Sequence, residues 1–139
     1  MNAEALKPFG LFASLGDEER AAVADLVEAQ DLDAGEQLFL EGQESDGLIL
    51  VESGALRITS QRAGELGRLG AGEVLGSLGL VVVGRREVTA VAEGETRVLT
   101  LTRESFQRLM LDEPRACCRV LETAICEFSG VARLALDRF

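Results

Sequence analysis

The spacing of apolar residues changes twice along this chain, and each change predicts a different kind of element. In the first part, apolar residues recur at helical spacing behind a run of three acidic residues. The middle part consists of short apolar runs separated by glycine, and helical spacing returns after Thr102. The predicted elements are a helix over about 17–29, a β-roll over about 30–101 and two C-terminal helices over about 103–138.

The middle region is predicted to form an antiparallel sheet structure. Apolar and polar residues alternate in segments 56–59 and 97–101, as is typical of strands with one face on a core and one face in water. Closely spaced glycines mark the turns between such strands. The fold class is therefore mainly β with flanking helices (α+β). We expect an antiparallel β-roll or jelly-roll barrel of about eight strands, in a single domain spanning residues 1–139.

The C-terminal part carries signals for two helices. Thr102 is a suitable N-cap for the first, and Pro114 suits the first turn of the second, where a missing N–H costs little. From Leu121 to Phe139, apolar residues keep to one stripe along the second helix. This stripe packs either on the chain's own barrel or on a partner's helix. We predict a homodimer through this helix, with Phe128 in the seam.

Charge and hydropathy exclude several classes of function. The chain has 24 acidic and 14 basic residues, a formal charge of −10, and no basic patch, which argues against a nucleic-acid partner. No apolar run approaches the roughly 18 residues that span a bilayer, and the N-terminal residues lack the features of a secretory signal. We expect no membrane association and a cytoplasmic location.

The chemical repertoire is equally restricted. The chain has no histidine, which excludes a Cys/His zinc site and histidine-dependent catalysis. Cys117, Cys118 and Cys126 fall in one predicted helix and are interpreted as small buried or interfacial side chains rather than a disulfide framework. No nucleophile–base pair is evident. We expect no enzymatic activity, no catalytic residue, no metal site and no cofactor.

The segment 70–91, GAGEVLGSLGLVVVGRREVTAV, contains the most specific candidate site. Its glycines predict a tightly folded loop, and the β-branched run after residue 80 limits any helix near 76–82 to a short one. Backbone N–H groups at a helix start, together with the guanidinium groups of Arg85-Arg86, would suit an anion. The alternative is a glycine-rich turn beside a solvated charge pair.

Three segments resemble the cyclic-nucleotide-binding domain family, which includes sensor domains of the catabolite activator protein, protein kinase A regulatory subunits and gated channels. PFGLFASLGDEERAAVADLVE is similar to the family's opening helix, and AGEQLFLEGQESDGLILVESGALRIT is similar to its first barrel half. LGAGEVLGSLGL is similar to the lead into its phosphate-binding cassette. The resemblance covers roughly residues 9–135 and implies a β-roll with a cyclic-nucleotide site.

The resemblance also implies roles for individual residues. Gly76 matches the cassette glycine, and Arg86 matches the arginine that pairs with the cyclic phosphate. Ser77 stands where the family has a glutamate that holds the ribose 2′-hydroxyl, so a charge-assisted hydrogen bond worth about 1.5–3 kcal/mol is lost. Glu87 replaces a small residue and brings a like charge near the phosphate. The predicted ligand-binding residues are Gly76, Ser77, Leu78, Arg86, Glu87 and Thr89.

Each of these residues could instead have a purely structural role. Arg86 could pair internally with Glu87 or be solvated, which would contribute roughly 0–1 kcal/mol. Ser77 could cap the short helix, and Thr89 could simply favour a strand.

Two functions follow from these alternatives. In the first, the domain is a non-enzymatic regulatory sensor: cyclic AMP, cyclic GMP or another small anion enters the cassette and repositions the C-terminal helices. In the second, the pocket is degenerate and the domain is a dimerisation or protein-interaction scaffold. Arg86 and the glycines favour the sensor, whereas Ser77 and Glu87 favour the scaffold. The sequence favours the sensor slightly, with output supplied by a protein partner or by further parts of a longer gene product.

Overall fold

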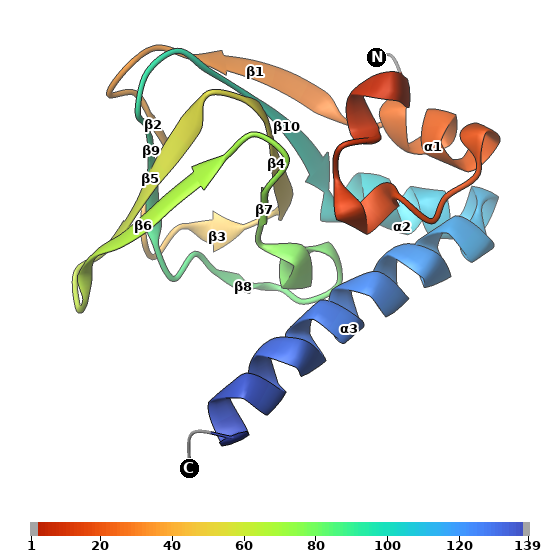
Figure 1. The fold of residues 1–139 in the computed structure, drawn as a ribbon. Coiled ribbons are helices and arrows are strands. Elements are labelled where there is room, and N and C mark those ends of the chain that lie inside the picture. The colour runs from red at the N-terminus through yellow and green to blue at the C-terminus, as the bar shows by residue number, and fades with distance from the viewer. Residues whose placement is uncertain (1–2, 138–139) are drawn as a thin grey trace. The chain divides into compact units, whose positions relative to one another are not determined.

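The structure is a computed structural model that describes residues 3–137, with side chains described from residue 3 through Cys126. The chain divides into two compact units. Figure 1 labels their helices and strands. Leu26–Gln107 form one unit, and the residues up to Asp25 form the other together with those from Arg108 onward. The prediction of one domain over residues 1–139 is not tested by this division and stays a prediction.

The unit Leu26–Gln107 contains ten short strands, and every pairing between them is antiparallel. They form a sheet of order β1-β10-β4-β7, a second of order β2-β9-β5-β6, and the pair β3-β8. The predicted antiparallel β-roll is confirmed. The strands are β1 (Glu28–Leu32), β2 (Gln37–Phe39), β3 (Glu44–Ser45), β4 (Gly47–Ser53), β5 (Ala55–Ser60), β6 (Gly64–Gly70), β7 (Val74–Leu75), β8 (Gly84–Arg85), β9 (Thr89–Ala92) and β10 (Thr96–Thr102).

Within the described residues these sheets do not close into a barrel, so the expectation of a barrel is corrected to separate sheets. The ladders are interrupted by register shifts at three places, in β2, β5 and β10. A bulge of this kind bends a strand and disrupts pairing locally. Each of these three ladders is therefore locally interrupted.

The apolar core of this unit draws its side chains from both four-stranded sheets. Ile49, Val51 and Val98 come from one sheet, and Leu56 and Ala90 come from the other. All five are at most 3% exposed. In β9 buried and half-buried positions alternate, as expected of a strand with one face on the core, whereas the first five residues of β4 are all buried.

Over residues 3–137 the structure also has three α-helices and three 3₁₀ helices. They are η1 (Ala3–Leu6), η2 (Gly10–Phe12), α1 (Asp17–Ala24), η3 (Ser77–Leu80), α2 (Arg103–Asp112) and α3 (Pro114–Asp137).

The predicted short helix near 76–82 is confirmed as η3, and the two C-terminal helices are confirmed as α2 and α3. Thr102 caps α2, since its Oγ1 accepts the Ser105 N–H at 3.1 Å. Pro114 is the first residue of α3, as predicted. The seam residue Phe128 lies outside the described side chains.

The first helix is shorter than predicted: it ends at Ala24, not near residue 29. From Glu28 onward the chain pairs with β10, so interstrand hydrogen bonds replace helical ones despite the helical spacing of the apolar residues.

Contacts inside the other unit connect α1 to its neighbours. Glu19 Oε1 accepts the Gly16 N–H at 2.9 Å and pairs with Arg119 Nη1 of α3 at 2.7 Å. Arg20 is buried and donates to the Leu15 carbonyl at 2.7 Å.

In the part of the chain that the structure describes, no helix has the length and apolar character needed to span a bilayer.

Gly47 offers a sharp test of strand packing. A Cβ at this position would collide with the Leu101 carbonyl oxygen and lie 2.7 Å from Thr102 Cα, both of which are backbone atoms of β10. We expect Gly47→Ala to lower the free energy of unfolding by about 1–3 kcal/mol. Gly84→Ala is the matched control, because an added Cβ there would meet no atom within 4 Å. Equal midpoints of urea denaturation for the two variants would contradict the prediction.

The cysteines differ in exposure and therefore in expected reactivity. Cys117 is buried, and burial raises its thiol pKa from 9.0 to about 11, with smaller contributions from Cys118 and Glu113. The thiolate is the reactive form, so at pH 8 iodoacetamide should modify exposed Cys118 and Cys126 and spare Cys117. Peptide mass spectrometry that finds all three thiols equally modified would contradict this assignment.

The raised pKa of Cys117 also predicts a dependence of stability on pH. Because the thiol deprotonates at lower pH in the unfolded chain, Cys117 should lower the free energy of unfolding as the pH rises from about 9 to 11.

Candidate functional site

A left-handed turn at Gly76 begins the candidate site. Gly76 has φ of +83° and immediately precedes η3. A Cβ added here would lie 2.6 Å from Arg86 Nη1 and 3.2 Å from the Gly47 carbonyl oxygen. Only glycine therefore allows both the turn and the close approach of the Arg86 guanidinium. The structure thus brings together Gly76 and Arg86, two of the predicted ligand-binding residues.

Arg86 lies between β8 and β9, and backbone hydrogen bonds to two residues before β3 hold it in place. Its N–H donates to the Gln43 carbonyl at 2.7 Å, and its carbonyl accepts the Gly42 N–H at 2.8 Å. The residue is 8% exposed. Its guanidinium carbon lies 4.3 Å from the centroid of the Phe39 ring. These contacts direct a buried positive charge toward Gly76.

The guanidinium of Arg86 is weakly paired for a buried cation. Within the described residues its ion-pair partner is Asp46, with Nη2 and Oδ1 3.5 Å apart, at the outer limit for a hydrogen bond. The Asp46 side chain is 70% exposed, so water screens its charge. Burial lowers the pKa of Arg86 from its ordinary value, and the Asp46 carboxylate offsets only part of this effect. A better-matched anion would therefore be attracted to Arg86.

The residues that begin η3 differ in exposure. Ser77 is half-buried and is the first helical residue, because Gly76 occupies the N-cap position. The interpretation of Ser77 as the helix N-cap is therefore wrong. Leu78 is 65% exposed. Among the described contacts, neither side chain reaches the Arg86 guanidinium.

The two remaining predicted residues do not join this cluster. Glu87 is exposed, and the structure pairs Arg86 with Asp46, so the proposed internal pair with Glu87 is wrong. The solvated interpretation of Arg86 is also wrong, because the side chain is buried. Thr89 Oγ1 accepts the Glu41 N–H at 2.9 Å, which gives this strand threonine a structural role.

Sequence reasoning missed three residues that surround the cassette. Phe39 and Asp46 contact the Arg86 guanidinium, and Arg103 donates to carbonyl oxygens of the cassette. Asp46 is separated from Arg86 by 40 positions, a distance at which no local spacing signal exists. Only the fold brings these side chains together.

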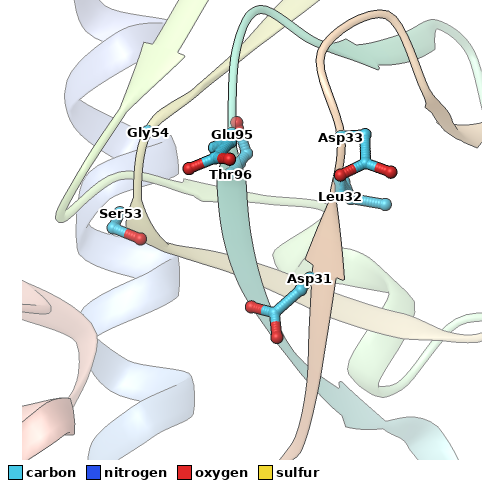
Figure 2. Close-up of a pocket in the computed structure, with 7 residues that line it drawn as sticks. All are labelled: Asp31, Leu32, Asp33, Ser53, Gly54, Glu95 and Thr96. Atoms are coloured by element: carbon cyan, nitrogen blue, oxygen red, sulfur yellow. The ribbon is translucent and has the colours of Figure 1, made fainter.

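A separate pocket of about 410 Å³ lies at the turns of the sheets and shares no residue with the predicted site (Figure 2). Asp31, Asp33 and Glu95 line it together with Ser53 at the β4–β5 turn. Three carboxylates disfavour an anionic ligand. Asp31 is already paired with Arg97, with Oδ1 and Nη1 3.2 Å apart.

Comparison with known proteins identifies the family. The model of the family described as "Cyclic nucleotide-binding domain" matches residues 29–113. A cAMP-dependent protein kinase regulatory subunit from Yarrowia lipolytica is 32% identical over 106 residues, which cover 76% of this chain and 28% of that protein. The chain spans about a quarter of the length of the curated relatives it matches.

Two solved structures agree with this result. The N-terminal domain of a transcriptional regulator from Streptomyces coelicolor A3(2) has a TM-score of 0.81 and 27% identity, covering 96% of this chain and 95% of that chain. The Thermus thermophilus Catabolite Activator Protein has a TM-score of 0.78 and 30% identity, covering 91% of this chain and 61% of that chain. The resemblance drawn from the three sequence segments is confirmed: the chain belongs to the cyclic nucleotide-binding domain family.

Proposed function

We propose that this chain is a regulatory sensor domain in which Arg86 binds the phosphate of a cyclic nucleotide, without catalysing a reaction itself. The observation that carries the proposal is a buried guanidinium whose ion-pair partner in the described chain is one distant, largely exposed carboxylate. The phosphate of a cyclic nucleotide would supply a charged acceptor for the bidentate bonds that arginine favours. Related regulatory subunits named for cAMP dependence support this choice of ligand.

The scaffold without ligand is the second candidate. Ser77 favours it, because a short neutral hydroxyl replaces the glutamate of the family pattern. Glu87 favours it less strongly, because its side chain is exposed and its repulsion of a phosphate would be screened by water. The two candidates differ in whether Arg86 contributes to binding.

The proposal also covers the cellular location of the domain and the source of its regulatory output. Cys118 and Cys126 are exposed free thiols, which fits a reducing cytoplasm. Because the chain spans about a quarter of its curated relatives, the output is proposed to come from a protein partner or from further segments of a longer gene product.

Restoring the family pattern around Arg86 tests the sensor. We expect the wild-type protein to bind cyclic AMP weakly, and Ser77→Glu with Glu87→Ser to raise its affinity by roughly tenfold to a thousandfold. The gain comes mainly from a charge-assisted hydrogen bond to the ribose, with a smaller contribution from removal of the exposed and screened charge of Glu87. Isothermal titration calorimetry measures the dissociation constants of the wild-type protein and of the double variant for cyclic AMP and cyclic GMP.

Variants of the neighbouring arginines provide the controls. Arg86→Ala in the restored background should erase the gain. Arg85→Ala should leave it largely intact, because the Arg85 side chain is exposed and donates to the Gly42 carbonyl at 2.8 Å. A folded double variant that produces no heat with millimolar cyclic nucleotide would reject the sensor. Tight wild-type binding would show that another residue replaces the missing glutamate.

A homodimer through α3 is also proposed. Ile125 lies on the predicted stripe and is 63% exposed, so a partner helix could cover it. Ile125→Glu should convert a dimer into a monomer, whereas Glu122→Gln, at another exposed position of α3, should not. Sedimentation equilibrium that finds the same mass for wild type and Ile125→Glu would reject this seam.

A further inference from the structure

Arg103 makes an unusual set of contacts for the first residue of a helix. Its guanidinium donates to the Ser45 carbonyl from Nη1 at 2.9 Å and from Nη2 at 3.1 Å. The same Nη1 donates to the Gly79 carbonyl at 3.2 Å and to the Val82 carbonyl at 3.3 Å. Its backbone N–H donates to the Asp46 carbonyl at 2.7 Å. One residue therefore connects α2, the β3–β4 junction and the cassette.

These contacts offset an unfavourable position. A positive side chain at a helix N-terminus is repelled by the partial positive charge of the unpaired backbone N–H groups. The carbonyl oxygens around Arg103 counter this repulsion with partial negative charge, and the fork of arginine donors can serve several acceptors at once.

Besides the buried Leu80 side chain and the close approach of Gly79 to Gly47, few contacts hold the turn that Arg103 contacts. Its internal bonds are few: the Gly79 N–H donates to Gly76 at 2.9 Å, and the Val81 and Val82 N–H groups donate to Leu78 at 3.1 and 2.9 Å. Leu80 is fully buried, but the other apolar side chains of this turn are exposed, with Val82 at 54% and Leu78 at 65%. A segment with few buried apolar contacts opens easily unless polar contacts restrain it.

The contact with Asp46 joins this restraint to the proposed anion site. Asp46 pairs with Arg86 through its carboxylate and with Arg103 through its carbonyl. A change in the Arg86–Asp46 pair would therefore shift the backbone that receives the first N–H of α2.

We propose that Arg103 is a positioning residue that fastens the cassette turn, residues 77–83, to the β3–β4 junction and links the Arg86–Asp46 pair to the start of α2. The proposal deepens the sensor function by naming the residue through which the anion site would be coupled to a helix. It concerns contacts between residues of this chain alone, so it can be tested independently of cyclic-nucleotide binding.

Residue-resolved amide exchange on the ligand-free protein tests the fastening. Arg103→Ala should accelerate exchange at Gly79, Val81 and Val82 by about tenfold or more, with little change at the Val51 amide, which is bonded to Glu73 in the same unit. Arg103→Lys should recover part of the protection, because an ammonium donates to carbonyls but lacks the fork.

Arg68→Ala is the matched control, since it removes an exposed arginine of the same unit that is paired with Glu93. It should leave the cassette amides unchanged. Unchanged exchange at these three amides in Arg103→Ala, or a uniform acceleration at every amide of the unit, would overturn the fastening role. Should Arg103→Ala fail to fold, Arg103→Lys decides: wild-type exchange at all three amides would overturn the proposal.

The link to α2 has its own measurement. Asp46→Asn weakens the pair with Arg86 while retaining the carbonyl that receives the Arg103 N–H. It should change the exchange rate of the Arg103 amide several-fold, and an unchanged rate would overturn the link. If no variant binds cyclic AMP in calorimetry, the proposed function fails, while these ligand-free experiments still decide the role of Arg103.

Discussion

The burial of a positive charge at Arg86 is the constraint around which the candidate site is arranged. Removing a guanidinium from water is costly, and this cost must be offset locally. The ring of Phe39 offers its negative face, Asp46 offers a screened carboxylate, and backbone bonds to Gln43 and Gly42 hold the residue in place. None of these contacts fully neutralises the charge, which leaves attraction available for a ligand.

Close backbone approach is the second constraint, and glycine makes it possible. At Gly76 a side chain would occupy the space of the Arg86 guanidinium. At Gly79 a Cβ would lie 2.8 Å from both the Gly47 carbonyl oxygen and Ser45 Oγ, so η3 packs directly on the start of β4. The glycines that mark a loop in the sequence therefore determine how near the cassette lies to the charged group.

Local sequence patterns predicted the helices and strands, but they could not predict contacts between residues that are far apart in the sequence. Alternation identified the strands, the Thr102 cap was recognised, and the family resemblance located Arg86. The end of α1 at Ala24 was missed because pairing of β1 with β10 decides it. Asp46 and Arg103 were missed for the same reason: their partners are set by the fold and not by spacing along the chain.

The energetics of Arg86 help to separate a sensor from a scaffold. An apolar side chain of similar volume over Phe39 would avoid the desolvation of a charge, and such replacements of buried ions are often neutral or stabilising. A domain that binds no ligand gains little from a buried cation whose ion-pair partner in the described chain is a single exposed carboxylate. A domain that binds an anion gains directly, because the desolvation of the guanidinium has already occurred on folding and need not be repeated on binding. The physical reason to place an arginine here is therefore stronger for a sensor, even though a serine hydroxyl would hold a ribose less strongly than a carboxylate.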